Sequence, residues 1–236
     1  MAYRQWRGLG GWTTIDAMTT GNETTVNESP LAPPAVPWAA AALDLVFSQE
    51  NRPVANHSVR SWAFARLLRD HLNLAGEVDE SLLFAGTVLH DIGLRRGARE
   101  PVRFEIDGAD LAAEFLTAQG LGAVDVDKVW EAIAVHTSDG ICERRGPLSM
   151  LVRAGVGIDL GYSTDLVTDE QAAVIHAAYP RLALGRGIVD DIVEQVREVP
   201  ERGPQYSIGA VLAHERSTPP HLSQLERDIA ASRWGE

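Results

Sequence analysis

Residues 82–93 read LLFAGTVLHDIG, an apolar run of helical length that ends in an imidazole and a carboxylate. Gly93 follows His90 and Asp91 closely and favours the end of a helix there. Burying an unpaired imidazole and carboxylate costs free energy, so such a pair needs partners inside the protein. The stretch therefore predicts a site where other polar groups, or a cation, meet the end of a buried helix.

Several donor-type side chains stand at the ends of other predicted helices. His57 opens one helical pattern, and Asp159 follows an apolar stretch. His136 ends another apolar run and is followed by Thr137. An isolated histidine is more often a satisfied helix residue than a ligand. From spacing alone, a metal site and a set of satisfied core residues both stay open.

Apolar residues recur three or four positions apart through most of the chain, which is typical of helices packed on a core. The predicted helices cover residues 38–47, 58–72, 81–90, 107–119, 125–137, 148–160, 169–179, 188–198, 206–215 and 222–231. Asn56, Asp79 and Asp107 are placed to cap three of them. No convincing alternating strand pattern interrupts the series. We therefore predict an all-α fold, a single-domain helical bundle.

The chain divides into an arm and one globular domain. Residues 1–34 are polar and aperiodic and then contain closely spaced prolines, which predicts a flexible N-terminal arm. The chain has 236 residues, 45% of them hydrophobic, enough for one sizeable core. We predict that residues 35–236 form one helical domain.

Charge and cysteine content exclude several classes of function. A net charge of −12 argues against nucleic-acid or anionic-membrane partners, because both require clustered positive charge. The single cysteine, Cys142, excludes an intramolecular disulfide and fits a reducing compartment. No signal-peptide pattern or membrane-length apolar run is present. We expect a cytoplasmic protein with a small-molecule partner, and association of identical copies stays open.

The order His57, His90-Asp91, Asp159 on an all-helical chain resembles the HD-domain superfamily of metal-dependent hydrolases. The resemblance covers roughly residues 56–161 and implies that these four residues are the metal ligands of an HD-type catalytic domain. Imidazole and carboxylate ligands suit zinc, iron, manganese, cobalt or nickel. We expect one divalent ion, with zinc as the first choice.

Further motifs resemble one branch, the cyanamide hydratase family. The motifs are NHSVRS at 56–61, LHDIG at 89–93, RFEIDGA at 103–109 and VWEAIAVHT at 129–137. The resemblance implies a lyase that adds water to a small nitrile, converting cyanamide to urea. It leaves the true substrate open.

Two other branches fit less well. Cyclic-dinucleotide phosphodiesterases of the HD-GYP type carry a lysine after HDIG and a His-His pair, whereas this chain has Leu94 and no such pair. Alarmone hydrolases resemble HDxxED, a pattern that is absent here. A phosphohydrolase acting on a nucleotide monophosphate stays the alternative because of nearby arginines. These are Arg95, Arg96, Arg99 and Arg103.

The resemblance also suggests roles around the metal. Asp91 and His136 are the expected catalytic residues, with Asp91 accepting a proton from water. Thr137, Glu105 and Arg103 are expected to bind substrate. Each has a plainer alternative: Glu105 as a helix cap, Arg103 in a structural ion pair, and His136 as a ligand or a supporting core residue. Beside the hydratase and the phosphohydrolase, the third class of function is a binding or scaffold protein without catalytic turnover.

Overall fold

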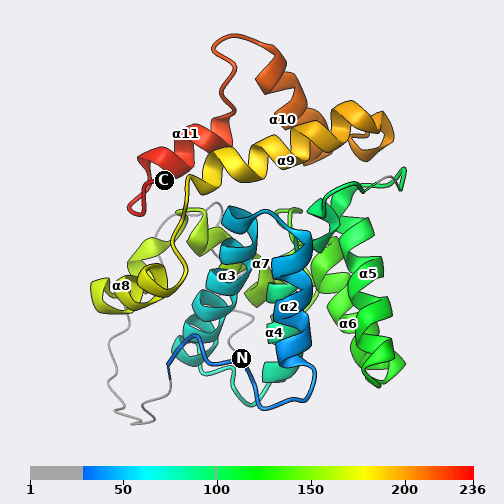
Figure 1. The fold of residues 1–236 in the computed structure, drawn as a ribbon. Helices are drawn as coiled ribbons and strands as arrows, with labels where there is room; N and C mark the ends of the chain where they lie inside the picture. The colour runs from blue at the N-terminus through cyan, green and yellow to red at the C-terminus, as the bar shows by residue number, and fades with distance from the viewer. Residues whose placement is uncertain (1–28, 99) are drawn as a thin grey trace.

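The computed structural model describes residues 29–98 and 100–236, and this part of the chain contains helices and no strand. The all-α prediction is confirmed (Figure 1). The α-helices are α2 (Ala39–Gln49), α3 (Arg52–His71), α4 (Glu80–Val88), α5 (Phe104–Ala118), α6 (Ala123–Ala134), α7 (Pro147–Asp159), α8 (Asp169–Ala178), α9 (Leu184–Glu198), α10 (Ile208–Ser217) and α11 (Gln224–Ala231). The 3-10 helices are η1 (Ile92–Leu94), η2 (Cys142–Arg144), η3 (Thr164–Leu166) and η4 (Pro200–Arg202).

Helix α3 is the centre of the main bundle, where it packs against α7 and α4. Trp62, Ala63 and Phe64 of α3 are fully buried in its core. Gly155 of α7 permits a close crossing, because a Cβ atom there would lie 2.5 Å from the carbonyl oxygen of Ser61. A small residue at this crossing therefore brings the C-terminal end of α7 beside α3.

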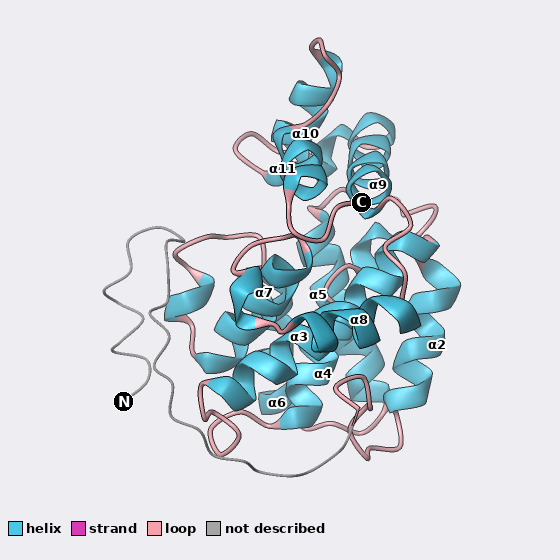
Figure 2. Ribbon diagram, turned by 90° about the vertical axis from the view of Figure 1, so that its left-hand side faces the viewer, coloured by secondary structure: helices cyan, strands magenta, loops and turns pink. Residues whose placement is uncertain are grey.

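Helices α9, α10 and α11 form a layer across one end of the bundle (Figures 1 and 2). Their apolar faces share a second buried cluster, which includes Ile188 and Val189 of α9, Leu212 of α10 and Ile229 of α11. Helix α9 also packs against α3 and η1. The layer thus covers the bundle end at which the turn after His90-Asp91 lies.

The start of α3 differs from the prediction at Asn56. The helix begins at Arg52, and the side chain of Asn51 caps it by accepting a hydrogen bond from the Val54 amide at 2.9 Å. Asn56 lies inside the helix and donates to the carbonyl oxygen of Pro180 at 2.7 Å. The prediction for Asp79 is confirmed, since its carboxylate accepts from the first amides of α4.

The start of α5 differs in the same way, so Asp107 is not an N-cap. The helix begins at Phe104, which places Asp107 inside it and 4% exposed. Its carboxylate pairs with Arg95 and with Arg202, the latter at 3.1 Å. The prediction was wrong because the arginines that hold Asp107 come from distant parts of the chain, and a cap is read from local sequence.

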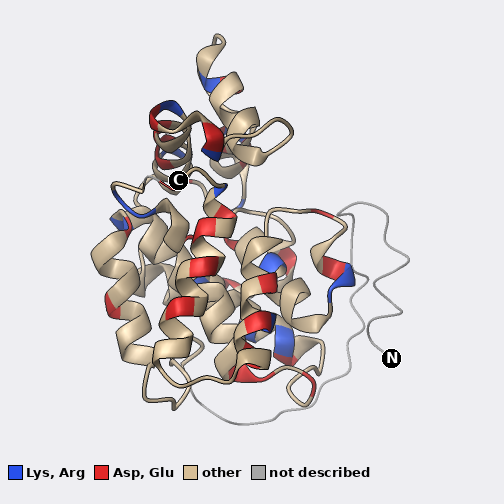
Figure 3. Cartoon of the chain, turned by 90° about the vertical axis from the view of Figure 1, so that its right-hand side faces the viewer, with Lys and Arg blue, Asp and Glu red and all other residues tan. Residues whose placement is uncertain are grey.

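Residues 1–28 of the predicted arm, and Arg99, lie outside the described residues. Leu31, near the end of the predicted arm, packs on the main core. Figure 3 shows many Asp and Glu residues on the side that carries α5 and α6, in keeping with the net charge of −12. Among the described helices, none has the length and apolar character that crossing a bilayer requires.

Candidate metal centre

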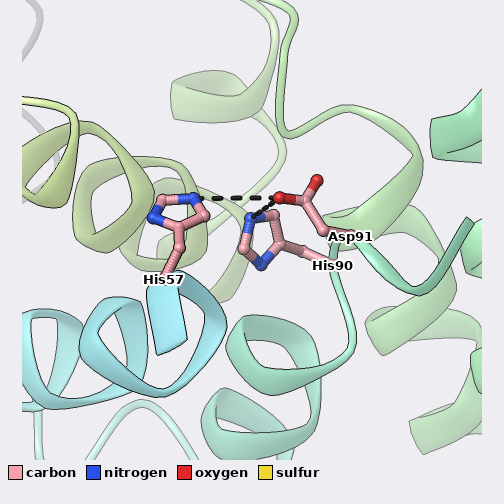
Figure 4. A group of neighbouring side chains, drawn as sticks. All are labelled: His57, His90 and Asp91. Carbon is pink, nitrogen blue, oxygen red and sulfur yellow. Dashed lines mark ion pairs between the residues drawn. The ribbon is translucent and has the colours of Figure 1, made fainter. Parts of the chain in front are cut away.

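Three of the predicted site residues meet in the interior: His57, His90 and Asp91 (Figure 4). One ligand atom from each lies within 4.8 Å of the others, and all three residues are buried. Asp91 Oδ2 lies 3.1 Å from His90 Nε2 and 3.8 Å from His57 Nε2. This is a compact set of two nitrogen donors and one oxygen donor.

Helix ends create this arrangement. His90 and Asp91 follow Leu89, the C-cap of α4, and so lie outside the last turn in which the sequence pattern placed them. His136 follows Val135, the C-cap of α6. Asp159 is the last residue of α7. The C-terminal end of a helix carries partial negative charge and favours a cation nearby. The ends of α4, α6 and α7 therefore add to the attraction of the carboxylate for a cation.

The other ring nitrogen of each histidine is held by a hydrogen bond. His57 Nδ1 donates to Asp159 Oδ2 at 2.6 Å, and His90 Nδ1 donates to the carbonyl oxygen of Thr87 at 2.7 Å. Because Nδ1–H donates in the neutral ring, the lone pair of Nε2 is left free. Hydrogen bonds of this kind orient metal-ligating histidines in proteins.

Three atoms that face one another in the cluster have no hydrogen-bond partner although they are buried. They are His57 Nε2, His90 Nε2 and Asp91 Oδ2. Unpaired buried polar atoms are rare and costly in native proteins. A divalent ion would satisfy all three atoms, and two imidazoles with one carboxylate suit zinc and its neighbours in the first transition row. The residues present therefore fit a divalent metal ion.

Asp91 is ionised and His136 is neutral in this environment. Burial by itself would raise the pKa of Asp91, but the nearby imidazole of His90 outweighs it and holds the pKa well below its usual range. Burial, followed by the charge of His90, lowers the pKa of His136 to about 4. His136 Nε2 lies 3.7 Å from Asp91 Oδ1, and its Nδ1 donates to the carbonyl oxygen of Ile133 at 2.7 Å. His136 is thus oriented as the other two histidines are and is placed at the edge of the donor set.

Asp159 lies on the far side of the His57 ring, outside the group of converging donor atoms. Its two oxygens accept from Arg60 Nε and Nη2, both at 2.7 Å, and Arg181 Nη1 lies 3.3 Å away. Burial would raise the pKa of Asp159, but the guanidinium of Arg60 outweighs it and the pKa is strongly lowered. In this structure the carboxylate of Asp159 contacts His57 and two arginines, and the role of a fourth ligand that the resemblance implies stays a prediction.

Glu105, Thr137 and Arg103 form a connected group beside His136. Thr137 Oγ1 donates to Glu105 Oε1 at 2.7 Å, and Arg103 pairs with the same carboxylate. Glu105 is 1% exposed and is therefore not a surface cap. Burial would raise its pKa, but the hydrogen bond from Arg103 and the charge of His136 lower it. The structure thus brings together the three residues expected to bind substrate.

Comparison with known families decides the class of protein. The model of the HD domain matches residues 54–221. This chain belongs to the HD domain family. The matched part includes the His57, His90-Asp91 and Asp159 positions of the signature. The prediction of an HD-superfamily protein is confirmed.

Two curated proteins are similar to this HD domain protein. They are the cyanamide hydratases DDI2 and DDI3 of Saccharomyces cerevisiae. Each is 27% identical over 158 residues, which cover 64% of this chain and 68% of the yeast protein. The HD family and this similarity together support a metal-dependent, hydrolase-like enzyme.

Sequence reasoning missed a residue that supports the HD pair from behind. Arg202 is 2% exposed and donates to the carbonyl oxygen of Gly93 at 2.8 Å. It also pairs with Asp107 and donates to Gln195, and Gln195 in turn donates to the Gly93 carbonyl oxygen at 3.2 Å. These bonds fix the turn that follows Asp91. No local signal marks Arg202, since it lies far along the chain in a short 3-10 helix.

Proposed function

We propose that this protein is a cytoplasmic hydro-lyase that adds water to a small nitrile, with cyanamide as the first candidate and urea as its product. The observation that carries the proposal is the set of three buried, unpartnered donor atoms on His57, His90 and Asp91. The similarity to two cyanamide hydratases supports the choice of substrate.

A divalent ion held by His57, His90 and Asp91 would acidify a bound water and so supply a hydroxide nucleophile near neutral pH. Zinc is the ion we propose first, with iron, manganese, cobalt and nickel as alternatives. Asp91 has a second oxygen, Oδ1, that faces His136 at 3.7 Å. We assign to Asp91 and His136 the removal of a proton from the attacking water, because both are in an acceptor state.

Asp159 in this proposal supports His57 and does not bind the ion directly. Its bond to His57 Nδ1 keeps the ring in the tautomer and orientation that the ion needs. His136 Nε2 is then the nearest further nitrogen beside the three donors.

The arginines around the site favour a neutral substrate over a phosphoester. Arg103 pairs with Glu105, and Arg95 pairs with Asp107. A guanidinium already neutralised by a buried carboxylate attracts a phosphate dianion less. Thr137, Glu105 and Arg103 offer hydrogen-bonding groups that suit the polar ends of a small linear molecule, and we assign them to substrate binding.

The test is a side-by-side activity screen of protein loaded with each metal ion. Cyanamide, simple nitriles and nucleoside monophosphates are supplied separately, and urea, amide and inorganic phosphate are measured. We expect metal-dependent release of urea from cyanamide. Release of phosphate from nucleotides without turnover of any nitrile would replace the proposal by the phosphohydrolase alternative.

Matched variants locate the activity. His90→Ala should abolish both metal binding and turnover, because it removes one of the three donor atoms. His214→Ala is the control, since His214 is exposed on α10. Wild-type protein should bind about one ion per chain. Turnover that persists in His90→Ala would contradict the assignment of the site.

A further inference from the structure

Residues 232–236, which follow α11, contact the end of α7 and the start of α9 (Figure 1). Trp234 Nε1 donates to the carbonyl oxygen of Ile158 at 2.7 Å. The backbone amide of Gly185, in the first turn of α9, donates to Glu236 Oε2 at 3.2 Å. This segment therefore joins the end of α7, where Asp159 lies, to the layer that covers the bundle.

The ring of Trp234 fixes the segment against the main bundle. It stacks on Phe64 of α3, with ring centroids 6.1 Å apart and planes inclined by 9°. The ring of His176 meets it edge-on at 5.2 Å. Gly161 permits the close approach, because a Cβ atom there would lie 2.3 Å from the Cβ atom of Ser232. The segment is thus packed on the bundle as well as hydrogen-bonded to it.

Arg181, in the link between α8 and α9, connects this segment to Asp159. Its Nε donates to the carbonyl oxygen of Gly235 at 2.9 Å. Its Nη1 donates to the main-chain carbonyl oxygen of Asp159 at 2.8 Å and lies 3.3 Å from Oδ1 of the same residue. The residue is 6% exposed. One buried guanidinium therefore contacts both the backbone and the carboxylate of Asp159.

Arg60 and Arg181 hold Asp159 in different ways. Arg60 donates to both carboxylate oxygens, from Nε and Nη2, each at 2.7 Å. Such a bidentate pair supplies the charge partner of the carboxylate. The shorter bond of Arg181 is to the main chain of Asp159, and its contact with the carboxylate is the longer one. Arg60 thus completes the charge pairing, and the added bonds of Arg181 fix how the side chain is turned relative to the helix end.

We infer that Arg181 is a positioning residue of the metal centre and that residues 232–236 keep it in place. Asp159 Oδ2 accepts from His57 Nδ1 at 2.6 Å, and the direction of that bond sets where His57 Nε2 points. Turning the carboxylate would turn Nε2 away from the other two donors. The inference rests on the proposed metal site, in which His57 Nε2 is one of the three donor atoms.

Arg181→Met tests the inference, because it removes these bonds while Arg60 still pairs with Asp159. We expect zinc to bind about 10-fold more weakly in isothermal titration, at the lower end of the range for a group that orients a ligand. Arg181→Lys should recover part of that affinity, since its ammonium group can donate to the same carbonyl oxygen. Arg186→Met is the matched control, because Arg186 is exposed on α9.

Trp234→Phe tests the contribution of the segment. Phenylalanine keeps a ring that can stack on Phe64 and removes the bond to the Ile158 carbonyl oxygen. We expect a loss of zinc affinity that is smaller than that of Arg181→Met. Tyr206→Phe is the control, since Tyr206 is 90% exposed. Wild-type zinc affinity in Trp234→Phe would overturn the role of the segment.

NMR of the metal-free protein separates orientation from general stability. The ¹⁵N and proton shifts of His57 Nδ1–H report its bond to Asp159, and those of His90 Nδ1–H, which donates to the Thr87 carbonyl oxygen, are an internal control. We expect Arg181→Met to move the His57 signal and to leave the His90 signal in place. An unmoved His57 signal, or zinc affinity equal to that of the wild type, would overturn the inference.

Two further measurements keep the test decisive. If Arg181→Met folds poorly, the same titration and NMR shifts are measured on Arg181→Lys, whose agreement with wild type in both would overturn the inference. Wild-type protein that binds zinc but hydrates no nitrile would reject the proposed function and leave the role of Arg181 standing. Wild-type protein that binds no divalent ion would reject the metal site and this inference together.

Discussion

The two nitrogen atoms of the His57 ring point to two buried polar clusters with opposite properties. On the Nε2 side, donor atoms of His57, His90 and Asp91 face one another without hydrogen-bond partners. On the Nδ1 side, each oxygen of Asp159 is engaged by His57 or by an arginine. Both clusters are removed from solvent, so burial does not distinguish them. The hydrogen-bond partners distinguish them. A cluster whose polar atoms are all paired stabilises the fold, whereas a cluster with unpaired polar atoms can still bind a ligand.

Asp91→Asn should produce the largest change in function. The variant removes the carboxylate of the unsatisfied cluster, so we expect loss of the bound ion and of turnover. The ion supplies several kcal/mol of transition-state stabilisation, which corresponds to a loss of roughly 10³-fold or more in kcat/KM. Metal analysis and urea release measure both effects.

The same variant should also lower the stability of the metal-free protein, but by less than Asp159→Asn. The pKa of Asp91 lies well below its usual range because the His90 imidazole outweighs burial, so the folded state stabilises the anion, and no arginine is left unpaired when it is removed. Denaturation in urea with a chelator present measures this stability. A large destabilisation of the metal-free variant would break the comparison, because Asp91 would then be a structural residue as Asp159 is.

Asp159→Asn should produce the largest loss of stability. It leaves Arg60, which is fully buried, without its carboxylate partner. Removing one partner of a buried ion pair costs about 3–5 kcal/mol of unfolding free energy. Asp165→Asn, at an exposed position in η3, is the matched control.

Metal binding by Asp159→Asn decides between a ligand and a supporting residue. A residue that orients a ligand typically contributes 10–100-fold in metal affinity, so the variant should bind the ion more weakly and still bind it. Isothermal titration with zinc measures the affinity. Complete loss of binding in a folded variant would restore Asp159 as a fourth ligand, as the sequence signature implies.

The sequence was sufficient for features that depend on local pattern. Apolar periodicity predicted all ten described α-helices, although the start of α3 lies at Arg52 and not at residue 58. The end of an apolar run identified His90 and Asp91, because burial of such groups has few explanations. His57 was predicted at the start of a helix, but it lies inside α3. Local signals therefore found both the helices and the centre of the site.

Features that depend on distant partners could not be predicted. Asn56 and Asp107 look like caps in sequence, but their partners are the Pro180 carbonyl oxygen and Arg202. Which side of His57 receives Asp159 depends on how α7 crosses α3, and spacing along the chain does not contain that geometry.

Arg202→Met tests the hydrogen bonds that hold the turn after Asp91, where the contributing polar side chains are paired. The variant removes bonds to Gly93 and Asp107, while Arg95 still pairs with Asp107. We expect a loss of about 2–3 kcal/mol in unfolding free energy, which is below that of Asp159→Asn because the carboxylate keeps one partner. Arg197→Met, at an exposed position in the last turn of α9, is the matched control and should change stability little.

The smallest expected effect is at Asp191, a carboxyl group that has one hydrogen-bond partner and no arginine partner among the described residues. It is partly buried and accepts this hydrogen bond from the neutral amide of Asn51. Burial, followed by the charge of Glu194, raises its pKa to about 7. The folded state therefore binds its proton more tightly than the unfolded state, and stability falls as pH rises from about 4 to about 7.

Asp191→Asn removes this penalty, so the variant should gain stability relative to wild type as the pH rises through that window. The gain should be under about 1 kcal/mol at pH 8, because solvent screens a partly exposed group, and it should disappear near pH 4. Urea midpoints of both proteins at pH 4, 6 and 8 measure the difference, with Asp165→Asn as the control whose difference from wild type stays flat. A difference of the opposite sign would mean that Asp191 is stabilised as an anion, and it would then belong with Asp159 among the satisfied carboxylates.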